Sequence, residues 1–267
     1  MGGISMADSV VSYEKIGSVA RITIHNESAF NAINEEVGAA LVDNFLQAKE
    51  DTTIRAIIIA GAGKAFSAGG DVGYFYRTIQ NGHVDIRPLL KILAKLAVLM
   101  KTLPKPIIAS TQGAAAGAGF SLALLSDYCI SADNCKFIQA FVNIGLVPDT
   151  GSLYLLTKAI GTARTTDLVM SGRVVSATEA AALGLVKKVV PLEALESETL
   201  AFAKEMAMGP TGAYGEMKQM LYKTGFSDFS SYLEMEIESQ HRASQTNDFK
   251  EGVKAFIEKR KAHFIGQ

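Results

Sequence analysis

Alternating apolar and polar positions, together with runs of β-branched residues, predict a series of short strands along the first 190 residues of this 267-residue chain. The first two flank Gly17 and Ser18, an arrangement typical of a β-hairpin. Two later runs are continuously apolar, which indicates strands buried on both faces of a sheet. The predicted strands are residues 10–14, 19–24, 54–60, 106–111, 128–131, 136–138 and 186–190.

Helical spacing of apolar residues appears between these strands and dominates the end of the chain. Val37, Leu41, Phe45 and Ala48 recur every three or four residues behind Asn34, which is suited to cap a helix. Further helices are predicted at 120–125 and 151–160, behind Ser176, and throughout the chain from residue 192. We expect 74–88 to be a mobile segment. Strand–helix alternation followed by a helical tail indicates an α/β fold, with a core over residues 6–195 and a helical region over 196–267.

Composition narrows the classes of partner. An apolar content of 48% is enough for a large core, and a net charge of −1 gives no basic field to attract nucleic acid or an anionic membrane. Cys129 and Cys135 are too few for a disulfide framework and are expected to be buried free thiols. The longest apolar run, 89–100, contains two lysines and is shorter than the roughly 20 residues of a membrane span. Because the N-terminus shows no basic region followed by an apolar core, as a secretory signal would, we expect a cytoplasmic location. Residues 1–5 precede a second methionine and are not counted as part of the fold.

Two predicted strands each end in a run of small residues, 61–71 and 113–119. Backbone N–H groups at such strand–helix junctions can stabilise an oxyanion, and glycine and alanine allow the ligand to approach closely. Neither run fits a phosphate loop: Gly63 and Lys64 are followed by Ala65 in place of Ser or Thr, and the second run lacks the last glycine of a dinucleotide fingerprint. Each run alone is equally compatible with turns that are small for packing reasons.

Together the two runs resemble motifs of one family. Segment 64–72, KAFSAGGDV, closely resembles a signature of the crotonase (enoyl-CoA hydratase/isomerase) superfamily. Segment 104–119, PKPIIASTQGAAAGAG, is similar to its partner motif, and 145–151 (GLVPDTG) and 180–186 (AAALGLV) resemble two more family landmarks. The resemblance covers nearly the whole chain in the family's order. It implies an enzyme that acts on an acyl-coenzyme A thioester through a stabilised enolate.

The resemblance also implies a fold, an assembly and site residues. The fold would be a crotonase-like spiral of ββα units, with the C-terminal helices forming a homotrimer or a dimer of trimers. The oxyanion donors would be the N–H groups of Gly70 and Ala118. No permanently bound cofactor is expected, because coenzyme A arrives as part of the substrate. No metal is expected either, because the His, Cys and carboxylate residues of the chain do not cluster at ligand spacing. The residues expected along coenzyme A are Ala29, Ala32, Lys64, Ala65, Phe66, Ala68, Gly69, Gly70, Asp71, Val72 and Gly117, with Lys259, Arg260 and Lys261 as further candidates for its phosphates.

The reaction is indicated by what the chain lacks. Hydratases of this family use two glutamates to hold a water molecule, and the matching positions here are Ser121 and Phe141. No glutamate occurs between Asp51 and Thr178. Asp149, which matches the catalytic acid of single-aspartate isomerases such as the ring-epoxide isomerase, is therefore the candidate proton shuttle. Its plainer alternative is a helix N-cap.

The sequence leaves three other functions open. One is a hydratase-type lyase. Another is a dehalogenase or hydrolase with an aspartate nucleophile, which is ranked lower because that relative pairs its aspartate with an indole and an imidazole. This chain has no Trp, and its histidines, His83 in the 74–88 segment among them, lie outside the matching motifs. The third is a catalytically silent acyl-CoA binder on the same fold.

Overall fold

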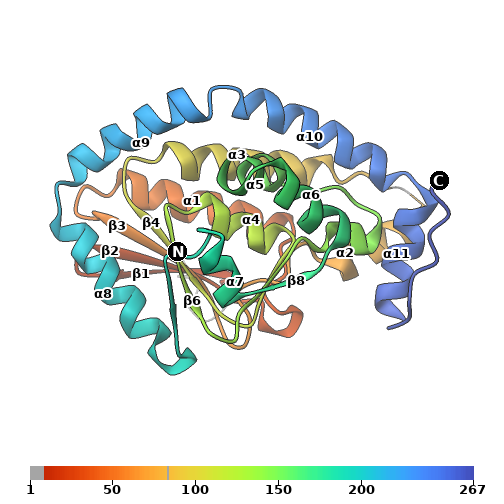
Figure 1. Ribbon diagram of the computed structural model, residues 1–267, viewed down its shortest axis with the longest axis horizontal. Coiled ribbons are helices and arrows are strands. Elements are labelled where there is room, and N and C mark those ends of the chain that lie inside the picture. Colours follow the sequence, from red (N-terminus) through yellow and green to blue (C-terminus); the bar gives the residue numbers. More distant parts are fainter. Residues whose placement is uncertain (1–8, 83) are drawn as a thin grey trace, which may run out of the picture.

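The computed structural model describes residues 9–82 and 84–267, and its centre is a twisted six-stranded sheet beside a smaller three-stranded one (Figure 1). The large sheet has the order β1-β2-β3-β4-β6-β9, and the small one β5-β7-β8. Only β1 pairs antiparallel in the large sheet. The strands are β1 (Val11–Ile16), β2 (Val19–Ile24), β3 (Ala56–Gly61), β4 (Ile107–Thr111), β5 (Ala114–Ala116), β6 (Tyr128–Ala132), β7 (Lys136–Ile138), β8 (Val174–Ser176) and β9 (Lys188–Val190).

Helices cover both faces of the large sheet. On β3, Ile57 and Ile59 belong to the main core beneath α1, and the alternate residues Ala56 and Ile58 pack in a second cluster with Ala203 of α8. This period-two division explains the continuous apolar run of β3. The helices are α1 (Glu35–Glu50), α2 (Val72–Gln80), α3 (Arg87–Thr102), α4 (Ala118–Leu125), α5 (Ser152–Ile160), α6 (Thr162–Ser171), α7 (Ala177–Ala182), α8 (Leu195–Met208), α9 (Thr211–Gly225), α10 (Phe229–Ser244) and α11 (Asn247–Ile257), with 3-10 turns η1 (Glu27–Ala29), η2 (Ala140–Ile144) and η3 (Leu192–Ala194).

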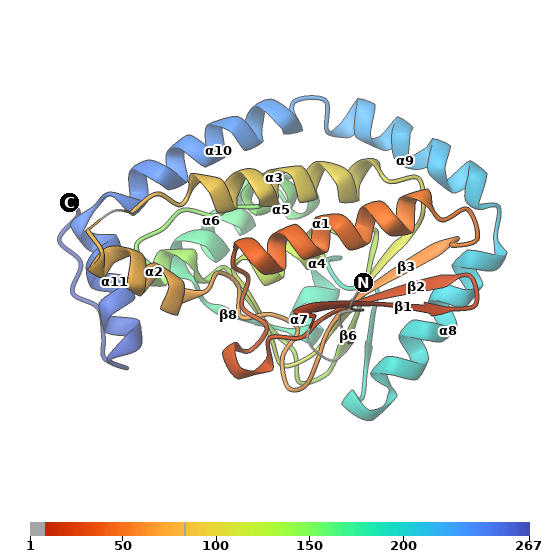
Figure 2. The same cartoon turned by 180° about the vertical axis from the view of Figure 1, so that it is seen from behind.

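The C-terminal helices form an arch over the core. In both views α9 and α10 run along the outer side of α3, and α11 turns back toward α2 (Figures 1 and 2). Contacts of α11 with α2 and η2 fix this return. In the part of the chain that is described, no helix is long and apolar enough to cross a membrane.

Most predicted elements are confirmed, with shifts of one or two residues at their ends. The side chain of Asn34 accepts from the N–H of Val37 (3.0 Å), and that of Ser176 from the N–H of Glu179 (3.1 Å), so both predicted caps are present. Two short strands, β5 and β8, were not predicted. β5 is a run of alanines that becomes a strand through its backbone pairing with β7.

The expectation of a mobile segment at 74–88 is wrong for its first part, which is helix α2. The Asp71 side chain caps this helix by accepting from the N–H of Tyr74 (2.9 Å). Phe75 packs edge-on against Phe249 of α11, with 5.8 Å between ring centroids. The cap and this distant contact together stabilise α2. His83 lies outside the described residues.

Candidate active site

The two small-residue loops leave the same edge of the sheet, because β3 and β4 are parallel neighbours. Beyond the strands the loops pair with each other. The N–H of Ser67 donates to the carbonyl of Ala114 (3.0 Å), and the N–H of Ala116 donates to the carbonyl of Ser67 (2.9 Å). This bridge brings residues 68–70 beside the N-terminus of α4.

Two glycines allow this close approach. A Cβ atom on Gly69 would lie 2.6 Å from the carbonyl oxygen of Ala116 and 3.2 Å from the nitrogen of Ala118, and the φ angle of Gly69 is +89°. Gly117, at the start of α4, has a φ of +50°. Any larger residue at position 69 would push the loops apart or strain the backbone.

Free backbone donors occur at this junction. The N–H of Gly69 donates to Ser67 Oγ (3.1 Å), that of Asp71 to the carbonyl of Ile33 (3.1 Å) and that of Gly117 to the carbonyl of Ile138 (2.9 Å). Among the described residues, no acceptor takes the N–H of Gly70 or of Ala118. Ala118 is the first residue of α4, where the helix itself leaves N–H groups free. Both residues line one cavity.

That cavity has a volume of about 690 Å³, within the usual range for a small-molecule site. Most of the residues expected at the site lie in its wall, and Lys259 and Arg260 of the C-terminal segment join them. The predicted residues in the wall are Ala29, Ala32, Ala68, Gly70, Asp71, Val72, Gly117, Ala118 and Asp149.

Four residues predicted to lie along coenzyme A are outside this wall. Lys64 and Ala65 line a separate depression together with Glu27. Phe66 is fully buried and belongs to the main hydrophobic core. Gly69 lies behind the junction and contributes the space that the two backbones need. The signature motif thus divides into wall residues and supporting residues.

Asp149 is a buried carboxylate in the cavity wall, 8% exposed. Its Oδ1 accepts from the hydroxyl of Thr150 (2.8 Å), and its Oδ2 accepts from the side-chain amide of Gln240 (3.2 Å). Burial raises the pKa of Asp149 to about 6, and these two hydrogen bonds act in the opposite direction. A carboxyl group with this pKa is suited to proton transfer near neutral pH.

The alternative role of Asp149 as a helix cap is wrong. Helix α5 begins at Ser152 and its N-cap residue is Gly151, with no side-chain cap. The backbone carbonyl of Asp149 accepts from Ser152, but its carboxylate is directed to Thr150 and Gln240. The side chain is therefore available to a ligand in the cavity.

The two positions that match the hydratase glutamates have other tasks. Ser121 is buried, and its hydroxyl donates to the backbone carbonyls of Asp149 (3.1 Å) and Gly117 (3.2 Å). Phe141 contributes its ring to the cavity wall. Within residues 9–82 and 84–267, no glutamate lines this cavity, and the carboxylates that do are Asp71, which caps α2, and Asp149.

Sequence reasoning missed two residues of α10. Gln240 lines the cavity, and Glu236 lies behind Asp149, where both of its carboxylate oxygens accept from the N–H of Gly151 (3.0 and 3.1 Å). The absence of glutamate from residues 51–178 does not extend to α10, whose Glu236 lies directly behind the cavity wall. Glu236 and Gln240 are four residues apart and so share one helix face, and this spacing was the sequence signal that could have paired them.

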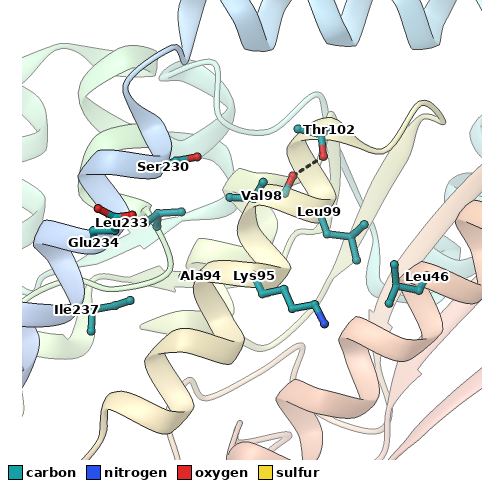
Figure 3. Close-up of a pocket in the computed structure, with 10 residues that line it drawn as sticks. All are labelled: Leu46, Ala94, Lys95, Val98, Leu99, Thr102, Ser230, Leu233, Glu234 and Ile237. Atoms are coloured by element: carbon teal, nitrogen blue, oxygen red, sulfur yellow. Dashed lines mark hydrogen bonds between the residues drawn. The ribbon is translucent and has the colours of Figure 1, made fainter.

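A second hollow of about 500 Å³ lies between α1, α3 and α10 (Figure 3). Its walls are mostly apolar, with Lys95 and Glu234 as the charged residues. The hydroxyl of Thr102 is already bonded to the carbonyl of Val98 (2.8 Å). It shares no residue with the cavity that Asp149 lines, so the catalytic chemistry is assigned to the larger cavity.

Comparison with known proteins agrees with this geometry. Residues 14–267 match the family model described as enoyl-CoA hydratase/isomerase. A crystal structure of an enoyl-CoA hydratase from Mycobacterium avium subsp. paratuberculosis has a TM-score of 0.87 and 27% identity, covering 96% of this chain and 98% of that one. The protein is therefore a member of the enoyl-CoA hydratase/isomerase family, with the crotonase fold, and acts as an enzyme of that family.

Similar curated proteins carry different activities in their names. The trans-2-decenoyl-[acyl-carrier-protein] isomerase of Streptococcus mutans is 37% identical over 96% of this chain and 98% of its own length. The 1,2-epoxyphenylacetyl-CoA isomerase of Escherichia coli is 33% identical over 98% and 100%. A probable enoyl-CoA hydratase of Rhodobacter capsulatus is 34% identical over 98% and 100%. Names alone therefore do not separate isomerase from hydratase.

Proposed function

We propose that this enzyme is an isomerase that moves a carbon–carbon double bond along the acyl chain of an enoyl thioester. The observation that carries the proposal is one buried carboxylate, Asp149, in the same cavity wall as the free N–H groups of Gly70 and Ala118. A 1,3-proton shift needs one acid–base group and an oxyanion hole, whereas hydration in this family needs a second carboxylate to hold water.

The proposed reaction has two proton transfers. Asp149 takes a proton from one carbon of the substrate, and the negative charge moves from the carboxylate to the thioester oxygen, which Gly70 and Ala118 stabilise by hydrogen bonds. Asp149 then returns the proton two carbons away, and the double bond is left in its new position. The ring of Phe141 in the wall helps to keep water from the enolate.

The acyl group is proposed to be an aliphatic chain. Among the described residues, this part of the wall has apolar side chains: Phe75 from α2, the α3 N-cap residue Ile86, and Leu89, Leu90 and Leu93 from α3. An apolar chain would bury its surface there at little cost, whereas the oxygen of a ring epoxide would lose hydration without gaining a partner on that wall. The hydrophobic wall therefore favours the double-bond isomerase over the ring-epoxide isomerase.

The experiment that tests this function measures conversion of an aliphatic 3-enoyl thioester to the 2-enoyl thioester. Coenzyme A and acyl-carrier-protein thioesters should be compared, since the two isomerase relatives are named for different carriers. We expect isomerisation with at least one carrier. Formation of 3-hydroxyacyl product at a comparable rate would instead favour a hydratase, and binding without turnover of either kind would favour a silent acyl-CoA binder.

The rate should depend on pH through Asp149. Because the carboxylate is the base and its pKa is raised to about 6 by burial, kcat/KM should fall as the pH drops below about 6 and reach a plateau above it. The measurement is kcat/KM for the 3-enoyl thioester across the acid range in which the enzyme stays folded. An acid limb near pH 4, the value expected of an exposed aspartate, would contradict the role of burial.

We also propose that residues 196–267 mediate a homotrimer or a dimer of trimers. In support, the outer arch exposes Met217, Met220 and Leu221 on α9, which are three and four residues apart and therefore share one face of that helix. An apolar face of this kind fits burial between copies. Light scattering coupled to size exclusion would give the mass of the assembly, and a monomer at micromolar concentration would refute it.

A further inference from the structure

Helix α10 presents a buried polar stripe to the turn that carries Asp149. Tyr232, Glu236 and Gln240 are four residues apart and so lie on one face of the helix. Glu236 is 6% exposed and Gln240 1%. Because glutamate is almost never fully buried without a specific partner, the burial of Glu236 implies that its carboxyl group has one.

The stripe holds both ends of turn 147–151. Gln240 Oε1 accepts from the N–H of Val147 (2.9 Å), and its amide nitrogen donates to Asp149 Oδ2 (3.2 Å). Glu236 accepts from the N–H of Gly151 through both oxygens (3.0 and 3.1 Å). The carboxyl group of Asp149 is therefore fixed between two anchored ends, in a turn where Thr150 has a φ of +57°.

Two acidic side chains are thus buried beside each other without a cation. In the described chain neither Asp149 nor Glu236 forms an ion pair. The groups that face Glu236 are Asp149, the N–H groups of Thr150 and Gly151, and the hydroxyl of Tyr232 on its own helix. From α5, Tyr154 packs against the ring of Tyr232, with 5.2 Å between centroids.

The environment gives the carboxyl groups of Glu236 and Asp149 different pKa values. Burial and then the charge of Asp149 raise the pKa of Glu236 to about 8, whereas that of Asp149 is raised only to about 6. Between these values the pair carries one proton and one negative charge.

We propose that Glu236 is a positioning residue for the isomerisation proposed above: it anchors the Asp149 turn through Gly151 and holds the single proton of the carboxyl pair, so that Asp149 meets the substrate as a carboxylate. Glu236 does not line the cavity, so it acts through Asp149 and does not touch the substrate. It stays neutral while the charge passes from Asp149 to the thioester oxygen and back. A second negative charge behind Asp149 would repel its carboxylate and displace the base from the position in which the turn holds it.

The first test needs no substrate and so separates this proposal from the proposed function. Glu236→Gln keeps an oxygen for the N–H of Gly151 but cannot ionise. Because the pKa of Glu236 is raised from 4.5 to about 8 on folding, its ionisation costs stability progressively between these pH values and by a constant amount above them. In thermal unfolding, the stability of E236Q relative to the wild type should therefore increase from pH 4.5 to about 8 and stay constant at higher pH. A difference independent of pH would overturn the proposal.

The second test is kinetic and uses the same variant. In the wild type kcat should decline as the pH rises through about 8, and in E236Q this alkaline decline should be absent, with the acid limb near pH 6 retained.

Glu236→Ala, which leaves the N–H of Gly151 without its acceptor, should lower kcat on the order of tenfold at neutral pH with little change in KM. An alkaline decline that persists in E236Q, or a loss in E236Q as large as that on removing the Asp149 carboxylate, would overturn the positioning role. Absence of isomerisation in the wild type, with the stability result as expected, would overturn the proposed function alone.

Discussion

Asp149→Asn should lower kcat for isomerisation by about 10² to 10⁴, the usual contribution of a general acid–base group. The amide cannot accept a proton from carbon, yet it keeps an oxygen that can accept from the hydroxyl of Thr150. Binding of an acyl-CoA should change little, because the enolate donors and the apolar wall are untouched. Steady-state kinetics and a binding titration on the same preparation measure the two effects separately.

A matched control is available in the same cavity. Asp71 is the other carboxylate in the described part of the wall, and its role is to cap α2 through the N–H of Tyr74. Asparagine caps helices as well as aspartate does, so Asp71→Asn should keep both the fold and most of the activity. Equal losses in D71N and D149N would mean that charge in the cavity matters and that neither carboxylate is a specific proton shuttle.

Ala118→Pro should lower kcat by about 10² to 10³, the cost of one oxyanion donor. Proline has no N–H, and its ring would occupy the direction in which that donor points. Ala118 is the first residue of α4, the position at which helices accept proline, so the melting temperature should stay close to that of the wild type. Kinetics, with thermal unfolding as the check on folding, measure this effect.

Ala118→Gly is the control for that substitution. It removes the side chain and retains the N–H, so kcat should remain near the wild-type value. If A118P were folded and still active, or if A118G were as impaired as A118P, the N–H of residue 118 would not be the group that stabilises the enolate.

The strands that lead into the two loops of the site could be predicted from their own sequences. β3 (AIIIAG) and β4 (IIAST) are rich in β-branched residues, and each leads into a glycine-containing loop, so strand and loop could both be predicted. β5 could not be, because three alanines have no strand preference and become a strand only by pairing with β7. Nor could α2, whose stability depends on the contact of Phe75 with Phe249, far away in the chain.

The part of the candidate site that is formed by backbone groups could be predicted from the sequence. The glycine motifs indicated a junction of two loops, and Gly70, Ala118 and Asp149 do line one cavity. Segment 64–72 did not indicate which of its residues line the cavity and which are buried beneath it: Phe66 belongs to the core, whereas Ala68 lines the cavity. The role of Glu236 could not be predicted, because a glutamate on an amphipathic helix is expected to face solvent, whereas here it accepts from the N–H of Gly151 in turn 147–151.

In the proposed reaction an enolate forms on the thioester, and one carboxylate carries its proton between two carbons. Proton NMR of an aliphatic 3-enoyl thioester incubated with the enzyme in heavy water detects both events. We expect a 2-enoyl thioester, with solvent deuterium at the α or γ carbon in a fraction set by how fast Asp149 exchanges its proton. A tightly bound thioester with no migration of the double bond and no exchange at either carbon would contradict it.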